Sequence, residues 1–235
     1  MIRTNRAFDP HTIKLVIFDL DGTLIDSRLD LVHSVNAALR HIERPELPAD
    51  VIASYVGDGA PVLIQRALGD ESGDEALVRK GLEFFLTYYR AHKLDHTTVY
   101  AGIHEALALI QKNNTGSKPR QMAVLTNKPV GPSRAIVEAL GLGGLLGQVY
   151  GGNSFVTKKP DPEGARVLLL EHRVKPGQAV MVGDSHVDVA TGRNADMFTI
   201  GVTYGFAPHT LNDPAPDVLV DAPEELGKVF EGKSF

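Results

Sequence analysis

Two aspartates, placed two residues apart, follow the apolar run of residues 13–18 and could act together on an anionic substrate or a metal ion. Asp19 and Asp21 belong to the segment Asp-Leu-Asp-Gly-Thr-Leu at residues 19–24. Such carboxylates can converge on a hard cation such as Mg²⁺, which prefers oxygen ligands and keeps water or substrate oxygens in its shell. Gly22 allows a sharp turn after the strand. A solvated Asp-Gly turn is the alternative, and the flanking apolar residues disfavour it.

Two further segments carry groups suited to holding a phosphate. Thr126 and Asn127 follow the apolar run 122–125, where a hydroxyl and exposed amides can donate hydrogen bonds to phosphate oxygens. Thr126 could instead cap the following helix. Lys159 precedes a proline and would be a fixed cation that offsets the charge of a phosphate and of nearby carboxylates. A solvated basic turn at residues 158–162 is the alternative interpretation.

A second acidic pair follows the apolar run 179–182. Asp184 stands at the expected strand end and could complete a metal site with the first pair. Asp188 lies one helical turn further on the same face, where it could orient metal-bound water from outside the coordination shell. Helix capping by Asp184 is the alternative. His186, between the two aspartates, is interpreted as an exposed helix residue.

Short apolar runs alternate with helical patterns along most of the chain. This alternation predicts βαβ crossovers and an α/β fold, a Rossmann-like parallel sheet with helices on both faces. In such sheets ligands bind beyond the carboxyl ends of the strands, where the polar residues above are expected. The expected strands are 13–18, 122–125, 179–182, 198–202 and, more weakly, 218–220; the expected helices are 103–110, 134–140 and 162–172.

Residues 26–95 break this alternation. They carry helical patterns without a convincing buried strand, so we expect a small all-α cap domain inserted after the first strand. The catalytic core would then comprise residues 1–25 and 96–235. The polar stretch 113–120 is expected to be a surface loop before a strand.

The composition limits the classes of function. The chain has 235 residues, 43% hydrophobic and 23% charged, so a packed core is expected. Its formal charge is −5, so no excess of basic residues favours nucleic acid or an anionic membrane as a partner. The absence of cysteine excludes disulfides and thiolate metal sites. No apolar run approaches the roughly 20 residues of a membrane span, and residues 1–10 lack a signal-peptide pattern. We therefore expect a soluble, cytoplasmic protein.

Taken in order, these segments resemble the motifs of the haloacid dehalogenase superfamily over residues 13–230. The four motifs are Asp-x-Asp-Gly-Thr at 19–23, Thr-Asn at 126–127, Lys-Pro at 159–160 and Gly-Asp-Ser-x-x-Asp at 183–188. The insertion is placed like the C1-type cap of that family. Within the family the resemblance is greatest to phosphoglycolate phosphatases, through residues 55–60, 66–68 and 201–206.

The resemblance implies roles for the acidic residues. Asp19 would attack phosphorus and form an aspartyl-phosphate, and Asp21 would protonate the leaving alkoxide and then deprotonate the hydrolytic water. Mg²⁺ would be held by Asp19, by the backbone carbonyl of Asp21 and by Asp184. Dehalogenases of the superfamily lack an aspartate at the second position, because a halide leaving group needs no proton. Asp21 therefore favours an oxygen leaving group.

The remaining motif residues would bind the phosphate. Thr126 and the amide of Asn127 would hold its oxygens, and Lys159 would balance its charge and that of Asp19. The cap would exclude water and select the substrate, with the loop 57–59 and Arg66 as candidates to face the site. For Arg66, a surface position on a cap helix is an equal alternative. A small cap favours a small phosphorylated metabolite as the partner, such as 2-phosphoglycolate.

Several alternatives stay open at the level of sequence. The same motifs serve a β-phosphoglucomutase-like phosphotransferase, a pyrophosphatase or a broad sugar-phosphate phosphatase. A non-catalytic binding module on the same fold is an alternative of another class. It would be expected to lose Asp19, Asp21 or Asp184, and all three are present. The oligomeric state is left open between a monomer and a homodimer.

Overall fold

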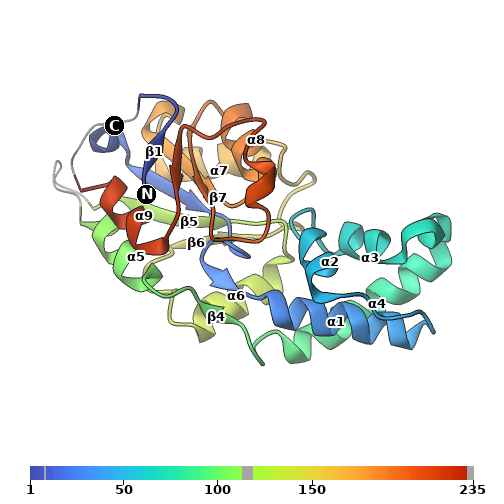
Figure 1. The fold of residues 1–235 in the computed structure, drawn as a ribbon. Coiled ribbons are helices and arrows are strands. Elements are labelled where there is room, and N and C mark those ends of the chain that lie inside the picture. Colours follow the sequence, from blue (N-terminus) through green and yellow to red (C-terminus); the bar gives the residue numbers. More distant parts are fainter. Residues whose placement is uncertain (8, 113–118, 232–235) are drawn as a thin grey trace.

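The computed structural model describes residues 1–7, 9–112 and 119–231. Its central feature is one seven-stranded sheet in the order β1-β9-β8-β7-β2-β5-β6 (Figure 1). All neighbouring strands run parallel except β1, which pairs antiparallel with β9 at one edge. The strands are β1 Arg3–Thr4, β2 Leu15–Phe18, β5 Gln121–Leu125, β6 Gln148–Tyr150, β7 Ala179–Gly183, β8 Phe198–Val202 and β9 Val218–Val220.

Helices cover both faces of this sheet, as the α/β prediction required. Side chains alternate along a strand, so Val16 and Phe18 of β2 enter one core with helices α5, α6 and α9. Leu15 and Ile17 point the other way and pack with α7 in a second core. The helices are α5 Ile103–Gln111, α6 Val130–Ala139, α7 Glu163–His172, α8 His186–Asn194 and α9 Pro223–Val229.

A separate group of four helices, which we call the helical insertion, lies to one side of the sheet (Figure 1). These helices bury a core of their own, built around residues such as Val35, Ile52, Ile64 and Phe85. The short strands β3 Ile25–Asp26 and β4 Thr98–Val99 pair antiparallel and bring the two ends of the insertion together. The helices are α1 Arg28–His41, α2 Ala49–Ser54, α3 Ala60–Leu68 and α4 Glu75–His92.

The polar stretch 113–120 differs in part from the surface loop that its composition predicts. Residues 113–118 lie outside the described residues, but Arg120 is buried. Its guanidinium donates hydrogen bonds to the carbonyls of Pro10, Ile13 and Ile110. A buried guanidinium is tolerable when its donors are satisfied, so Arg120 joins the segment that precedes β2 to α5.

Two further findings complete the fold. Strand β6 extends the sheet beyond β5, and no apolar run in the sequence indicates it, because Gln148–Tyr150 contains one aliphatic residue, Val149. Among the described residues, no helix is both long and apolar enough to cross a membrane.

Candidate active site

Three polar side chains predicted from separate motifs meet at the carboxyl edge of the sheet. Asp19 follows β2, Thr126 follows β5 and Asp184 follows β7, and β2 lies between the other two strands. The backbone N–H of Asp19 donates to the carbonyl of Val182 (2.9 Å), which continues the pairing of β2 with β7 beyond the strand. The register of the parallel strands therefore brings these residues together.

Lys159 is the cation of this cluster. Its Nζ lies 2.9 Å from Asp19 Oδ1 and 2.5 Å from Asp188 Oδ1, and all three side chains are buried. Asp188 also accepts hydrogen bonds from the backbone N–H (3.1 Å) and hydroxyl (2.7 Å) of Ser185. Asp188 thus holds Lys159 beside Asp19, and the sequence does not indicate this pairing of Lys159 with Asp188. The predicted role of Asp188 toward metal-bound water stays a prediction.

The carboxylates are crowded in a way that suits a bound cation. Oxygens of Asp19, Asp184 and Asp188 lie within 4.8 Å of one another. Burial, together with the charges of Asp188 and Asp19, raises the pKa of Asp184 above the ordinary range, and burial also raises the pKa of Asp19 although Lys159 opposes the shift. A divalent cation would relieve this repulsion, and all the ligand atoms are oxygens, as a hard cation requires.

The backbone closes tightly around Asp184. Its Oδ2 accepts hydrogen bonds from the N–H groups of Phe206 (2.6 Å) and Ala207 (3.2 Å). Gly22 has a φ of +76°, and a Cβ there would collide with the Asp184 carboxylate. A glycine is therefore required both for the turn after Asp21 and for the close approach of the two acidic segments.

Asp21 is held by two partners. Lys128 Nζ lies 2.9 Å from each carboxylate oxygen, and the Ser27 hydroxyl donates to Oδ1 at 2.5 Å. Lys128 is buried, and its Nζ also lies 4.5 Å from the centre of the Tyr89 ring. The sequence motifs assign no function to Lys128, Ser27 or Tyr89. The signal available for Lys128 is its position directly after the Thr-Asn pair.

The Asn127 side chain has a positional role. Its Nδ2 donates to the carbonyls of Gly57 and Lys159, each at 3.0 Å. It thereby connects the loop 57–59 of the helical insertion with the segment that carries Lys159. Phosphate binding by Thr126, which is buried at the same edge, and by the backbone amide of Asn127 stays a prediction.

A cavity lies between the sheet edge and the helical insertion. The loop 57–59 contributes Gly57 and Gly59 to its wall, whereas Arg66 is not among the lining residues. Arg66 instead pairs with Asp58 at 2.6 Å and donates to the carbonyl of Tyr55. The lining residues from the sheet edge are Asp19, Asp21, Thr126, Asn127, Lys128, Asp184 and Ser185; those from the insertion include Leu31, Leu63, Phe85, Leu86 and Tyr89.

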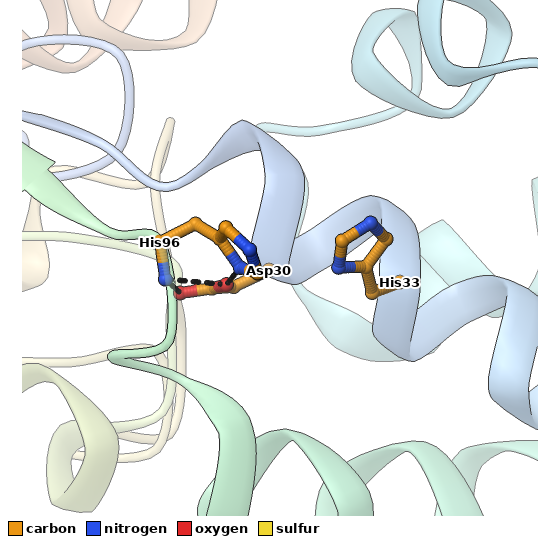
Figure 2. A group of neighbouring side chains, drawn as sticks. All are labelled: Asp30, His33 and His96. Carbon is orange, nitrogen blue, oxygen red and sulfur yellow. Dashed lines mark hydrogen bonds and ion pairs between the residues drawn. The ribbon is translucent and has the colours of Figure 1, made fainter.

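A second cluster of ionisable groups lies where the insertion joins the sheet-bearing part (Figure 2). Asp30 of α1 is buried and accepts hydrogen bonds from the backbone N–H groups of His96 and Thr97, from His96 Nδ1 (2.9 Å) and from the Thr97 hydroxyl (2.7 Å). The rings of His33 and His96 are arranged edge to face, with 5.1 Å between their centres. These bonds occupy the Asp30 carboxylate. We therefore interpret Asp30, His96 and Thr97 as a clasp, a set of hydrogen bonds that joins the segment entering the insertion to the segment leaving it.

The clasp yields a stability prediction. Replacing Asp30 with alanine leaves the donors of His96 and Thr97 unpaired, and we expect the free energy of unfolding to fall by about 2–4 kcal/mol in urea titrations. His33→Ala serves as the control and should change it by less than about 0.5 kcal/mol, because His33 is exposed. Equal stability of Asp30→Ala and the wild type would contradict the clasp.

The stabilisation by Asp30 should also depend on pH. Burial alone would raise the pKa of Asp30, but the hydrogen bonds from Thr97 and His96 outweigh it and lower the pKa. A lowered pKa in the folded state stabilises the protein above the unfolded value of about 4, and this contribution is lost as the pH falls through the lowered pKa. The difference in the free energy of unfolding between the wild type and Asp30→Ala should therefore become smaller in acid, as urea titrations at several pH values would show.

The fold and the edge residues define an α/β protein with an acidic site at the carboxyl ends of its parallel strands. A family model described as "Haloacid dehalogenase-like hydrolase" matches residues 16–202, and the chain belongs to this family. It is 39% identical to phosphoglycolate phosphatase of Chromobacterium violaceum over 203 residues, covering 83% of this chain and 87% of the relative. It is 38% identical to that of Pseudomonas syringae pv. tomato over 197 residues, covering 82% and 70%.

Solved structures resemble the chain over nearly its whole length. A structure from Haemophilus somnus, described as a predicted phosphoglycolate phosphatase, superimposes with a TM-score of 0.85 at 29% identity and covers 94% of this chain and 99% of its own. β-Phosphoglucomutase from Clostridium difficile reaches a TM-score of 0.75 at 19% identity, covering 91% and 93%. The second likeness concerns the fold alone.

Proposed function

We propose that this chain is a Mg²⁺-dependent phosphomonoesterase that hydrolyses 2-phosphoglycolate, or a similarly small phosphorylated metabolite, through an aspartyl-phosphate. The observation that carries the proposal is the buried Asp19, paired with Lys159 at 2.9 Å and flanked at the cavity by Asp21 and Asp184. The relatives from Chromobacterium violaceum and Pseudomonas syringae are named for this activity. A nucleophile, an acid–base group and acidic metal ligands are the parts that such a reaction requires.

Asp19 would be the nucleophile. One of its carboxylate oxygens attacks phosphorus in line with the leaving oxygen, and the bond from phosphorus to the leaving oxygen breaks as the new bond forms. Lys159, fixed by Asp188, holds the Asp19 carboxylate in place and balances charge at the phosphate. Water then attacks the aspartyl-phosphate, releases inorganic phosphate and regenerates Asp19.

Asp21 would serve as the general acid and base. It gives a proton to the leaving alkoxide and later takes one from the hydrolytic water. Ser27 and Lys128 fix the orientation of its carboxylate beside the cavity. Thr126 and the backbone amide of Asn127 would donate hydrogen bonds to the phosphate oxygens.

The proposed cofactor is Mg²⁺, held by Asp19, Asp184 and the backbone carbonyl of Asp21. The crowding of buried carboxylates and the raised pKa of Asp184 support a cation at this place. When bound, the ion would neutralise the phosphoryl oxygens and so permit a dianionic substrate to approach the aspartates. Asp188, already paired with Lys159, lies beside these ligands.

We also propose that residues 26–95 act as a cap on a core formed by residues 1–25 and 96–235. The insertion has its own apolar core, and its two ends meet at the β3–β4 pair, as a hinge would require. Closure over Asp19 would exclude water during phosphoryl transfer. The cavity that the insertion covers would set an upper limit on substrate size.

A substrate panel with Mg²⁺ tests this proposal. We expect kcat/KM to be highest for 2-phosphoglycolate when it is compared with pyrophosphate, glucose phosphates and nucleoside monophosphates. The release of inorganic phosphate is the measurement, with p-nitrophenyl phosphate as a general reporter of phosphatase chemistry. A clear preference for pyrophosphate or a hexose phosphate would overturn the substrate assignment, and no turnover of any ester would overturn the enzymatic one.

A further inference from the structure

The wall of the active-site cavity has an uneven distribution of charge. The helical insertion contributes apolar side chains, and the sheet edge contributes the carboxylates of Asp19, Asp21 and Asp184. Within the described part of the chain, Lys128 is the cation among the lining residues. A second anionic group on a substrate would therefore have one charged partner in this wall, namely Lys128.

Lys128 can donate a hydrogen bond to such a group while it keeps its contacts with Asp21. An ammonium has three N–H donors, and the bonds to the two oxygens of Asp21 use two of them. The buried Nζ lies against the face of the Tyr89 ring, 4.5 Å from its centre. The ion pair with Asp21, 2.9 Å long, favours the charged form of Lys128, so the side chain is a cation at this place.

Tyr89 supplies an independent observation that points to a ligand. Tyr89 lines the cavity and the residue is 3% exposed, yet its hydroxyl has no hydrogen-bond partner in the described structure. A buried hydroxyl without a partner is destabilising, so such groups are uncommon in folded proteins. Burial raises the pKa of Tyr89 to about 12, and the hydroxyl is therefore a donor at neutral pH.

We propose that Lys128 and Tyr89 together form a subsite that binds the carboxylate of the substrate. The inference rests on the proposed function, because it assigns the part of the substrate that the phosphate-binding residues do not hold. In 2-phosphoglycolate one methylene separates the carboxylate from the ester oxygen. Asp21 is the group that we place beside this ester oxygen. Lys128, which donates to Asp21, is therefore also within reach of the substrate carboxylate.

The subsite explains how a small anionic substrate could be selected. A substrate carboxylate beside Asp19, Asp21 and Asp184 is repelled by their charges and loses its hydration. A cation offsets the repulsion, and hydrogen-bond donors replace the lost water. Lys128 comes from the sheet edge after β5 and Tyr89 comes from α4 of the insertion. The carboxylate would thus contact both parts of the molecule and favour the arrangement in which they lie together.

The test compares two substrates that differ in this group. Ethyl phosphate has the same number of carbon atoms as 2-phosphoglycolate but no carboxylate, so the ratio of their kcat/KM values measures carboxylate recognition. We expect Lys128→Met to lower this ratio by at least about 30-fold and Tyr89→Phe to lower it by about 5- to 10-fold, mainly through KM. Lys128→Met should also slow both substrates, because Asp21 loses a partner, and the ratio removes that common effect.

Matched controls and a second variant keep the test decisive. Lys80→Met and Tyr88→Phe change residues on the same helix as Tyr89 that are absent from the cavity wall, and they should leave the ratio unchanged. Tyr89→Phe keeps the ring and its stacking on Phe85, so it still tests the subsite where Lys128→Met folds poorly. A wild-type preference for 2-phosphoglycolate that survives in both variants would overturn the subsite alone. A wild type that does not discriminate between the two substrates would overturn the proposed substrate and the subsite with it.

Discussion

Asp19→Asn is expected to lower kcat for phosphate release by at least about 10⁴-fold, because an amide lacks the anionic oxygen that attacks phosphorus. The fold should persist. Lys159 keeps its 2.5 Å contact with Asp188 in this variant, and one charge is removed from a crowded group of carboxylates. Steady-state phosphate release measures the first expectation, and circular dichroism with thermal unfolding measures the second.

The control for this substitution is Asp70→Asn, which removes an exposed carboxylate that does not line the cavity. It should match the wild type in both measurements. Chemical trapping followed by peptide mass analysis adds a direct readout: the wild type should carry phosphate on the peptide that contains Asp19, and the variant should not. Turnover by Asp19→Asn at the wild-type rate would contradict the assignment of Asp19 as the nucleophile.

Mg²⁺ is expected to be required for turnover and to stabilise the folded protein. Chelation should abolish phosphate release, and addition of MgCl₂ should restore it. At a free concentration 100 times the dissociation constant, a ligand that binds only the folded state adds about 2.7 kcal/mol to its stability. The physical reason is the repulsion among Asp19, Asp184 and Asp188, whose oxygens lie within 4.8 Å of one another.

The stabilisation should increase with pH. Burial raises the pKa of Asp184 and of Asp19 in the folded protein, so without a cation the folded state loses stability as the pH rises above the unfolded value of about 4. Thermal unfolding with MgCl₂, compared with NaCl at equal ionic strength, isolates the specific effect. Asp184→Asn should lose the response to Mg²⁺ and Asp70→Asn should keep it. A wild type that melts identically in both salts and turns over in excess chelator would contradict the metal site.

Much of the fold was predictable because its signals are local. Each buried strand of the sheet interior is a short apolar run, and each is followed by a polar residue at the point where the strand ends. Parallel strands place these ends at one edge, so the proximity of Asp19, Thr126 and Asp184 followed from the α/β pattern. Strand β6 was not predicted because its three residues, Gln-Val-Tyr, include a single aliphatic side chain, whereas β9, equally short, reads Val-Leu-Val.

The pairing of individual charges was not predictable in the same way. Lys128 meets Asp21 across 107 positions of sequence, and Asp30 meets Thr97 across 67. Arg120, in a stretch rich in polar residues, is buried because carbonyls of residues 10 and 13, more than 100 positions away, and of Ile110 accept its hydrogen bonds. Nothing in the types or spacing of neighbouring residues specifies such partners, since they are selected by how elements pack.

The candidate site shows both kinds of information. The acidic pair at Asp19 and Asp21 depends on a strand end and a glycine turn, which a few adjacent residues encode, so their chemistry can be inferred from the chain alone. The environment of that pair is assembled from β5, the segment before α7, and α4 of the helical insertion. Burial, ion pairing and the unpaired hydroxyl of Tyr89 emerge only when these described elements pack together, because desolvation and hydrogen-bond satisfaction are properties of the packed interior.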